Sequence, residues 1–212
     1  MKNPLLIPFL AILLTIFVVS FISKQEKTTN EKLFREYLRG FKQAKFPLEL
    51  TAKIATFNPQ RVIPKKFNKF LPDDMKTHFM TRVPMRFHNE YAHKLVENDS
   101  IVAVVCGSIS TPLDTNAKKF LSYTKIMIIY DKKGNILGNY QIASNSRWNY
   151  GVANINDSLV CKTLYYEKYK DATKKAEIAE LHDFKISPSG KIIGIKQEIY
   201  LPSITMKRAD FW

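Results

Sequence analysis

The stretch NDSIVAVVCGS at residues 98–108 decides the fold, because its first part returns later in the chain. NDSIV at 98–102 recurs as NDSLV at 156–160, and DKKGNILG at 131–138 is echoed by SPSGKIIG at 187–194. The members of the two pairs are separated by nearly the same number of residues. This spacing predicts a structural unit that occurs twice.

Each unit, at about residues 98–143 and 156–201, is expected to hold three strands joined by turns. The predicted strands are 101–108, 123–130 and 136–143 in the first unit, and 159–168, 178–186 and 192–201 in the second. β-Branched residues fill these runs, as strands favour. Asn and Asp bond their own backbone in turns, and Gly134 and Gly190 can adopt the positive φ that a hairpin requires.

The sequence therefore predicts a mainly β fold with a minor helical part. We expect an antiparallel meander of about seven to nine strands, formed by the two three-strand units and curled into an open barrel or a two-layer sheet. A propeller is not expected, because closure takes about four or more blades and only two copies of the unit are visible. Residues 46–212 are expected to form this single β-rich domain.

Residues 23–45 are predicted to be a linker followed by an amphipathic helix. TTNE at 28–31 has the spacing of a capping box, which marks a helix start. One helical face then carries the apolar residues Leu33, Phe34, Tyr37, Leu38 and Phe41. This stripe most simply packs on the β domain, and a helix lying on the membrane surface is the alternative. Pro47 ends the helical pattern before a short strand at 48–50.

The first 22 residues are predicted to be a membrane anchor or a signal peptide. PLLIPFLAILLTIFVVSFI at 4–22 has no charged residue, and its length falls between a spanning helix of about 20 residues and a signal-peptide core of about 7–15. We expect an anchor with the domain outside the cytoplasm, in the periplasm or at the cell surface. The protein would be secreted if residues 1–20 were removed. Lys24 and Lys27 argue for the opposite, cytoplasmic orientation.

The net charge of +14, from 33 Lys and Arg against 19 Asp and Glu, favours anionic partners. The lysines are dispersed as pairs along the chain, a pattern typical of a solvated surface. We expect contact with the membrane through residues 4–22, and with anionic lipid or an envelope glycan through the positive charge. Nucleic acid is not an expected partner, and a protein partner is not identified.

No stretch predicts a catalytic centre, a metal site or a cofactor site. His88 and His93 are five residues apart, whereas the zinc-protease motif needs histidines four apart on one helical face. Phosphate-binding glycine loops and a C-x-x-C motif are absent from the sequence. Cys106 and Cys161 could form a disulfide or remain two separate buried thiols.

The stretch SNSRWNYG at 144–151 is the best candidate for recognition. It joins the two units and carries Arg147, Trp148 and Tyr150, which are residue types that dominate binding surfaces. The alternative is that Trp148 fills one end of the core. We expect a loop here in either case.

In layout, the chain resembles uncharacterised anchored or secreted envelope proteins of bacteria. The resemblance rests on the apolar N-terminus, the aromatic helix, FPLEL at 46–50 and the NDS and D-x-x-G turns. It implies a compartment and a mainly β fold, and it assigns no catalytic residue. We therefore expect a non-enzymatic, membrane-tethered or exported envelope domain with a binding or scaffolding role. A hydrolase or metal-dependent enzyme built from dispersed residues such as His88, Glu90 and His182 is one alternative, and a cytoplasm-facing polyanion binder is another.

Overall fold

The computed structural model describes residues 29–51, 59–76, 85–112, 122–145, 149–167 and 177–197. The apolar run at 4–22 lies outside these ranges, so the anchor and the signal peptide both remain predictions. Within the ranges described, no helix is long and apolar enough to cross a membrane.

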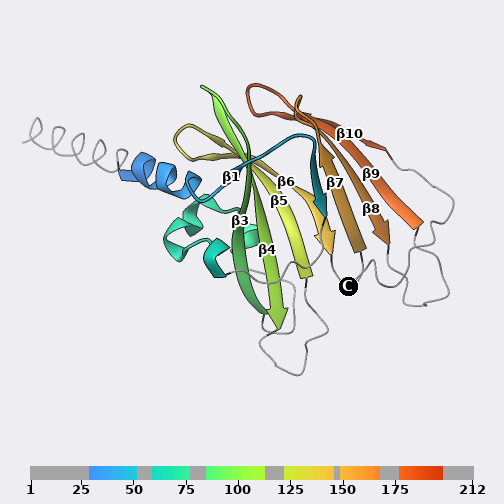
Figure 1. The fold of residues 1–212 in the computed structure, drawn as a ribbon, viewed down its shortest axis with the longest axis horizontal. Helices are drawn as coiled ribbons and strands as arrows, with labels where there is room; N and C mark the ends of the chain where they lie inside the picture. The colour runs from blue at the N-terminus through green and yellow to red at the C-terminus, as the bar shows by residue number, and fades with distance from the viewer. Residues whose placement is uncertain are drawn as a thin grey trace, which may run out of the picture.

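One open sheet of ten strands makes up most of the structure (Figure 1). The strands are β1 (Lys42–Gln43), β2 (Leu48–Thr51), β3 (Met85–Glu97), β4 (Ile101–Pro112), β5 (Ser122–Asp131), β6 (Ile136–Asn145), β7 (Asn149–Ile155), β8 (Val160–Glu167), β9 (Glu177–Ile186) and β10 (Ile192–Gln197). From β3 to β10 each strand pairs antiparallel with the next, while β1 pairs parallel with β3. The predicted mainly β fold and antiparallel meander are confirmed.

The two repeated units correspond to β4–β6 and β8–β10, and their turns match closely. Asp131 N–H donates to the Asn135 carbonyl at 3.0 Å, and Ser187 N–H donates to the Lys191 carbonyl at 2.9 Å. Gly134 and Gly190 occupy equivalent places in these turns with φ of 89° and 85°, as predicted. β7 is an additional strand between the units. It begins at Asn149, inside the stretch where we expected a loop.

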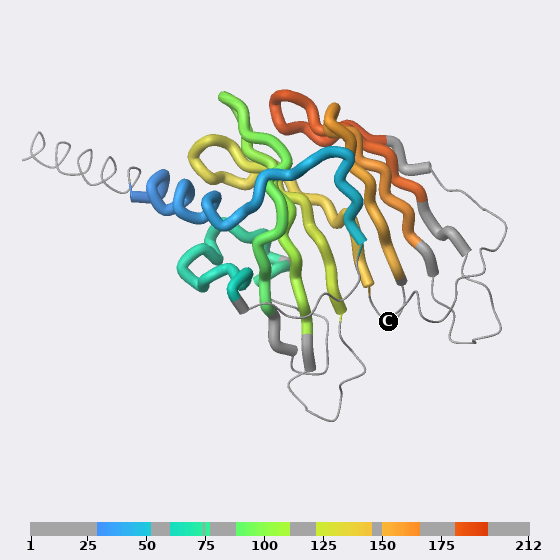
Figure 2. Tube along the Cα trace, in the orientation of Figure 1, coloured from blue at the N-terminus to red at the C-terminus, as the bar shows by residue number. Residues whose placement is uncertain are grey.

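A corner between β6 and β7 divides the sheet into two halves, β3–β6 and β7–β10. β6 and β7 pair only at Ser144–Gly151 and Asn145–Tyr150. Beyond this point β2 takes the place of β6, pairing antiparallel with β7 from Leu48–Ile155 to Thr51–Val152. The segment that contains β1 and β2 therefore bridges both halves, as the path of the tube in Figure 2 shows.

The two halves fold back on each other around a shared apolar core. Tyr140 on β6 packs against Phe184 on β9, with ring centroids 4.5 Å apart, although these strands are not neighbours in the sheet. The turn at Gly190 lies against Ile101 and Ile129 of the other half. This inner core comprises Ala44, Leu48, Leu50, Leu95, Ile101, Ala103, Val105, Met127, Ile129, Ile142, Ala153, Ile155, Cys161, Phe184 and Ile186.

A helical layer covers the outer side of the first half. It consists of the helix at residues 29–38 and three short 3-10 helices, η1 (Pro59–Arg61), η2 (Lys65–Phe70) and η3 (Asp73–Met75). Its contact with the sheet forms an outer core of Phe34, Tyr37, Leu38, Phe41, Ile63, Phe67, Phe70, Leu71, Met75, Val102, Val104, Cys106, Ile126, Ile128 and Tyr130. The order of layers is thus helical layer, first half, inner core and second half.

Candidate functional site

The apolar face of the helix at 29–38 is fully used in the outer core. Phe34 is 2% exposed, Tyr37 is 0% exposed, and both pack against the ring of Tyr130 on β5. The predicted packing of this stripe on the β domain is confirmed. The alternative of a helix that inserts its apolar stripe into a membrane surface is wrong, because that stripe is covered by the sheet.

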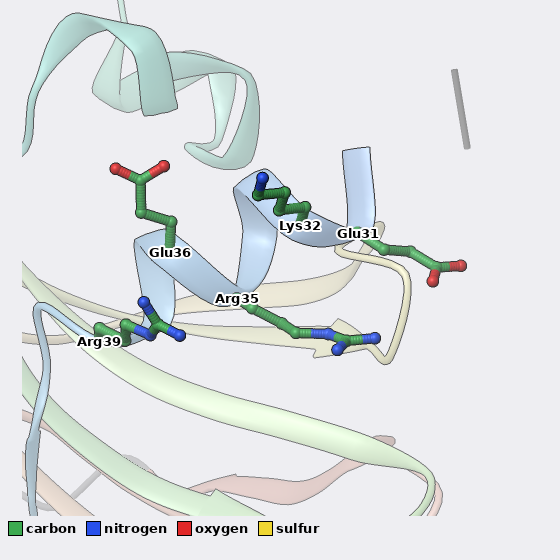
Figure 3. Close-up of a pocket in the computed structure, with 5 residues that line it drawn as sticks. All are labelled: Glu31, Lys32, Arg35, Glu36 and Arg39. Atoms are coloured by element: carbon green, nitrogen blue, oxygen red, sulfur yellow. The ribbon is translucent and has the colours of Figure 1, made fainter. Parts of the chain in front are cut away.

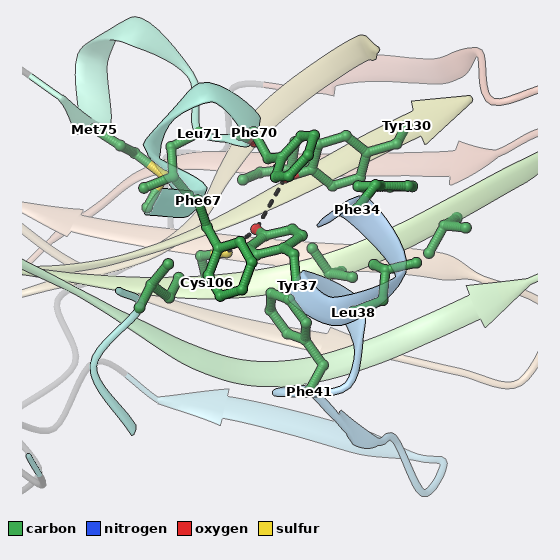
Figure 4. Packing of buried hydrophobic residues seen from close by; sticks show 14 of the residues in the cluster. Phe34, Tyr37, Leu38, Phe41, Phe67, Phe70, Leu71, Met75, Cys106 and Tyr130 are labelled. Carbon is green, nitrogen blue, oxygen red and sulfur yellow. Dashed lines mark hydrogen bonds between the residues drawn. The ribbon is translucent and has the colours of Figure 1, made fainter. Parts of the chain in front are cut away.

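A buried chain of hydrogen bonds ties the helix to the sheet (Figure 4). The Tyr130 hydroxyl donates to the Phe70 carbonyl at 2.6 Å, so its oxygen accepts the proton of the Tyr37 hydroxyl at 3.0 Å. Since the single proton of Tyr37 is used there, the Cys106 thiol at 3.5 Å is the donor to Tyr37. Burial raises the pKa of the Cys106 thiol to about 12 and also raises the pKa of Tyr37 and Tyr130. The chain is therefore uncharged at neutral pH.

With its apolar side buried, the helix turns a charged side to solvent. Figure 3 shows Arg35 and Arg39 extending from the helix away from the 3-10 helices. Lys32, Arg35 and Arg39 are exposed at helical spacings of three and four residues, so they lie along one side. Together with Glu31 and Glu36 they line an open hollow of about 530 Å³. A hollow this open fits a broad surface contact better than an enclosed small molecule.

Two further lysine groups lie beside the helix. η2 is held next to it by an ion pair between Lys66 and Glu36. The β5–β6 turn lies beside the first described residues of the helix, where Asn30 Nδ2 donates to the Lys133 carbonyl at 3.4 Å. We call the resulting exposed set the basic surface, which comprises Lys32, Arg35, Arg39, Lys65, Lys66, Lys69, Lys132 and Lys133.

Acidic side chains near the basic surface are largely engaged in local contacts. Glu36 pairs with Lys66, and Glu97 receives Lys94 at 2.8 Å and Lys132 at 3.7 Å. The hydrogen bond from Lys94, aided by the charges of Lys94 and Lys132, lowers the pKa of Glu97. Asp131 accepts the Lys133 and Asn135 backbone N–H groups at 2.8 and 2.9 Å, inside its own turn. The cations therefore outnumber the acids that are open to a partner.

A separate row of polar residues crosses the side of the first half that faces the inner core. The registers align Glu90 on β3, Gly107 on β4 and Lys125 on β5. Gly107 leaves room for the Tyr123 hydroxyl, which would lie 2.8 Å from a Cβ atom at this position. Burial, followed by the charge of Glu90, raises the pKa of Tyr123 to about 12, and burial lowers the pKa of Lys125. Glu90 is buried and Lys125 is half-buried in this row.

The sequence-predicted recognition residues fall into two classes. Arg147 and Trp148 lie outside the described ranges, so their binding role remains a prediction. Tyr150 is on β7, is 7% exposed, and packs with Ile109, Tyr123 and Ala143. For Tyr150, the structure thus shows a core position.

The two cysteines are free thiols in separate parts of the structure. Cys106 belongs to the outer core, and Cys161 belongs to the inner core, where it lies 3.6 Å from the Thr163 hydroxyl. The disulfide that we considered between them is absent here, because the β4 residue faces the helical layer and the β8 residue faces the opposite half. Burial raises the pKa of Cys161 to about 11.

The residues considered for a dispersed enzyme site are spread over the sheet. His88 and Glu90 are on β3, whereas His182 is on β9, where it contacts the hydroxyl of Tyr140 and the ring of Tyr165. Among the side chains that the structure describes, no group of three or more His, Cys, Asp or Glu could hold a metal ion.

Comparison of the chain with protein-family models, curated proteins and solved structures gave no match.

Proposed function

We propose that the protein is a non-enzymatic domain with a binding or scaffolding role, tethered to a bacterial envelope membrane by residues 4–22 and located outside the cytoplasm. The observation that carries this proposal is the docking of the helix at 29–38 on the sheet. In the sequence, residues 23–28 separate the apolar run from the described part of that helix. Because the helix is part of the core, a tether at 4–22 would hold the whole domain close to the bilayer rather than at the end of a long linker.

The chemistry of the described residues supports binding rather than catalysis. In the polar row Glu90 is buried and Lys125 is half-buried, and the thiols of Cys106 and Cys161 are buried with raised pKa values. The basic surface, in contrast, presents exposed cations from three segments that lie together. Such a surface recognises an anionic partner by charge.

Protease accessibility in cells that express the full chain tests this proposal. We expect the protein in the membrane fraction, with its domain digested when protease is added to spheroplasts, and also in intact cells if the domain is at the cell surface. Recovery in the soluble fraction would contradict the tether. Protection in both preparations would contradict the export and would support a cytoplasm-facing polyanion binder, which is the second candidate because the basic surface suits that role equally well.

A further inference from the structure

The position of the basic surface points to a specific partner: we infer that it docks on an anionic phospholipid bilayer, the one in which residues 4–22 are tethered. This inference rests on the proposed function and adds the lipid class and the face of the domain that meets it. It also fixes an orientation, with the helical layer toward the membrane and the second half of the sheet away from it.

Three segments that are distant in sequence bring cations together on and beside the same helix. The helix supplies Lys32, Arg35 and Arg39, and η2 and the β5–β6 turn supply the lysines on either side of it. The Asn30–Lys133 contact places the β5–β6 turn at the N-terminal end of the described helix, and the Lys66–Glu36 pair places η2 beside its later part. Along the chain, the apolar run leads into the N-terminal end of this helix. A bilayer that receives the apolar run is therefore the anionic surface nearest to these side chains. Each basic residue close to such a surface contributes about 1 kcal/mol of attraction, and the contributions of several residues add up.

The side chains of two η2 lysines lie over aromatic rings of the outer core. Lys66 Nζ lies 4.9 Å from the ring centroid of Phe67, and Lys69 Nζ lies 5.2 Å from that of Phe70. Both rings are buried, so the lysine stems lie on the apolar layer while their ammonium groups stay at the surface, where that of Lys66 pairs with Glu36. This arrangement suits a contact with lipid phosphates, which needs accessible charge rather than deep pockets.

The opposite side of the molecule provides an internal control. Lys162 on β8 and Lys185 on β9 are exposed, and they alternate with Cys161 and Phe184, which face the inner core. They therefore lie on the outer side of the second half, with both halves of the sheet between them and the helical layer. A docked domain would leave these two lysines in solvent.

Lysine footprinting of the full chain tests the orientation. The chain is reconstituted in vesicles of phosphatidylcholine alone or of phosphatidylcholine with phosphatidylglycerol, treated with a membrane-impermeant amine-acetylating reagent, and analysed by mass spectrometry. We expect acetylation of Lys32, Lys65 and Lys69 to fall several-fold in the anionic vesicles, with Lys162 and Lys185 unchanged. The protection should disappear in about 1 M NaCl, where the Debye length is about 3 Å.

A matched pair of variants separates docking from non-specific attraction. Arg35→Gln with Arg39→Gln should remove most of the protection in anionic vesicles, whereas Lys162→Gln with Lys185→Gln, with the same loss of charge, should leave it intact. Equal effects of the two pairs, or equal lysine reactivity in both vesicle types, would overturn the docking. Stronger protection by soluble polyphosphate than by anionic vesicles would overturn it in favour of a soluble polyanion. Failure of the chain to float with either vesicle type would instead contradict the tether.

Discussion

Replacing Tyr37 by Phe probes the contact on which the orientation of the domain depends. The change removes one buried hydroxyl, which donates to Tyr130 and accepts from Cys106. A neutral hydrogen bond contributes about 1 kcal/mol net, and the lost thiol bond adds little because S–H is a weak donor. We therefore expect Tyr37→Phe to lower the free energy of unfolding by about 1–1.5 kcal/mol.

Tyr130→Phe should lower the free energy of unfolding further. The Phe70 carbonyl would lose its donor, and the Tyr37 hydroxyl would lose its acceptor. Leaving buried polar groups without partners costs about 1–3 kcal/mol, so we expect about 2–3 kcal/mol for this variant. The assay is urea unfolding of the full chain in detergent, followed by circular dichroism, with the m-value checked for constancy. In the double variant the two effects should fall short of additivity by about 1 kcal/mol, the value of the shared bond. Strict additivity would refute the bond between Tyr37 and Tyr130, and a smaller loss for Tyr130→Phe than for Tyr37→Phe would refute the direction assigned to this hydrogen-bond chain.

Three further predictions follow from the turns and the thiols. Gly134→Ala should destabilise the fold by about 2 kcal/mol, because Gly134 has φ of 89° and a Cβ would lie 2.8 Å from Phe34, whereas Gly138→Ala, whose Cβ would meet its nearest atom at 4.0 Å, should be nearly neutral in thermal unfolding. Burial, the largest single effect, raises the pKa of the Asp131 carboxyl, but hydrogen bonds from Asn135, Lys133 and Gly134 together outweigh it and lower the pKa overall. The charge of Asp131 therefore stabilises the fold above the ordinary pKa of 3.8, and the stability difference between wild type and Asp131→Asn should shrink as the pH falls below that value. A difference independent of pH would contradict this assignment. Cys106 and Cys161, with pKa values raised to about 12 and about 11, should resist a thiol reagent at pH 8 in the folded protein and react in denaturant, and rapid labelling of the folded protein would show that they are exposed.

The repeated turns made the β meander predictable from the sequence. Their chemistry is local: Gly134 and Gly190 need positive φ, and Asn98 Oδ1 accepts the Ser100 N–H at 2.8 Å two residues along the chain. The helix at 29–38 was predictable for the same reason, because its apolar spacing is contained in a few consecutive residues, whereas the predicted cap at Thr28 lies outside the described residues.

β7 and its pairing with β2 were not predictable in this way. β7 mixes Gly151 and Asn154 with apolar residues and therefore lacks a clear strand pattern. Its place is set by β2, whose residues come about one hundred positions earlier in the chain, and by the corner at Ser144. Only the tertiary packing shows that Tyr150 is buried, and its role in recognition stays a prediction.

The basic surface also depends on tertiary structure. In the sequence, the pairs at 65–66 and 132–133 look like dispersed surface lysines. The ion pair of Lys66 with Glu36 and the contact of Asn30 with Lys133 bring them beside the same helix. The sequence does not show which segments pack on the helix, so it could not predict that these lysines lie together.

The distance of two fluorescent labels from the membrane surface tests the central claim most directly. Because the native thiols are buried, a fluorophore can be attached at Asn68→Cys in η2 or at Asn154→Cys on β7, both exposed positions. Asn154 lies on the outer side of the second half, about two layers of 10 Å each further from the membrane than Asn68. With the full chain in anionic vesicles that contain nitroxide headgroup lipid, we predict strong quenching at residue 68 and weak quenching at residue 154. Equal quenching at both positions, or stronger quenching at residue 154, would contradict an orientation set by the docked helix.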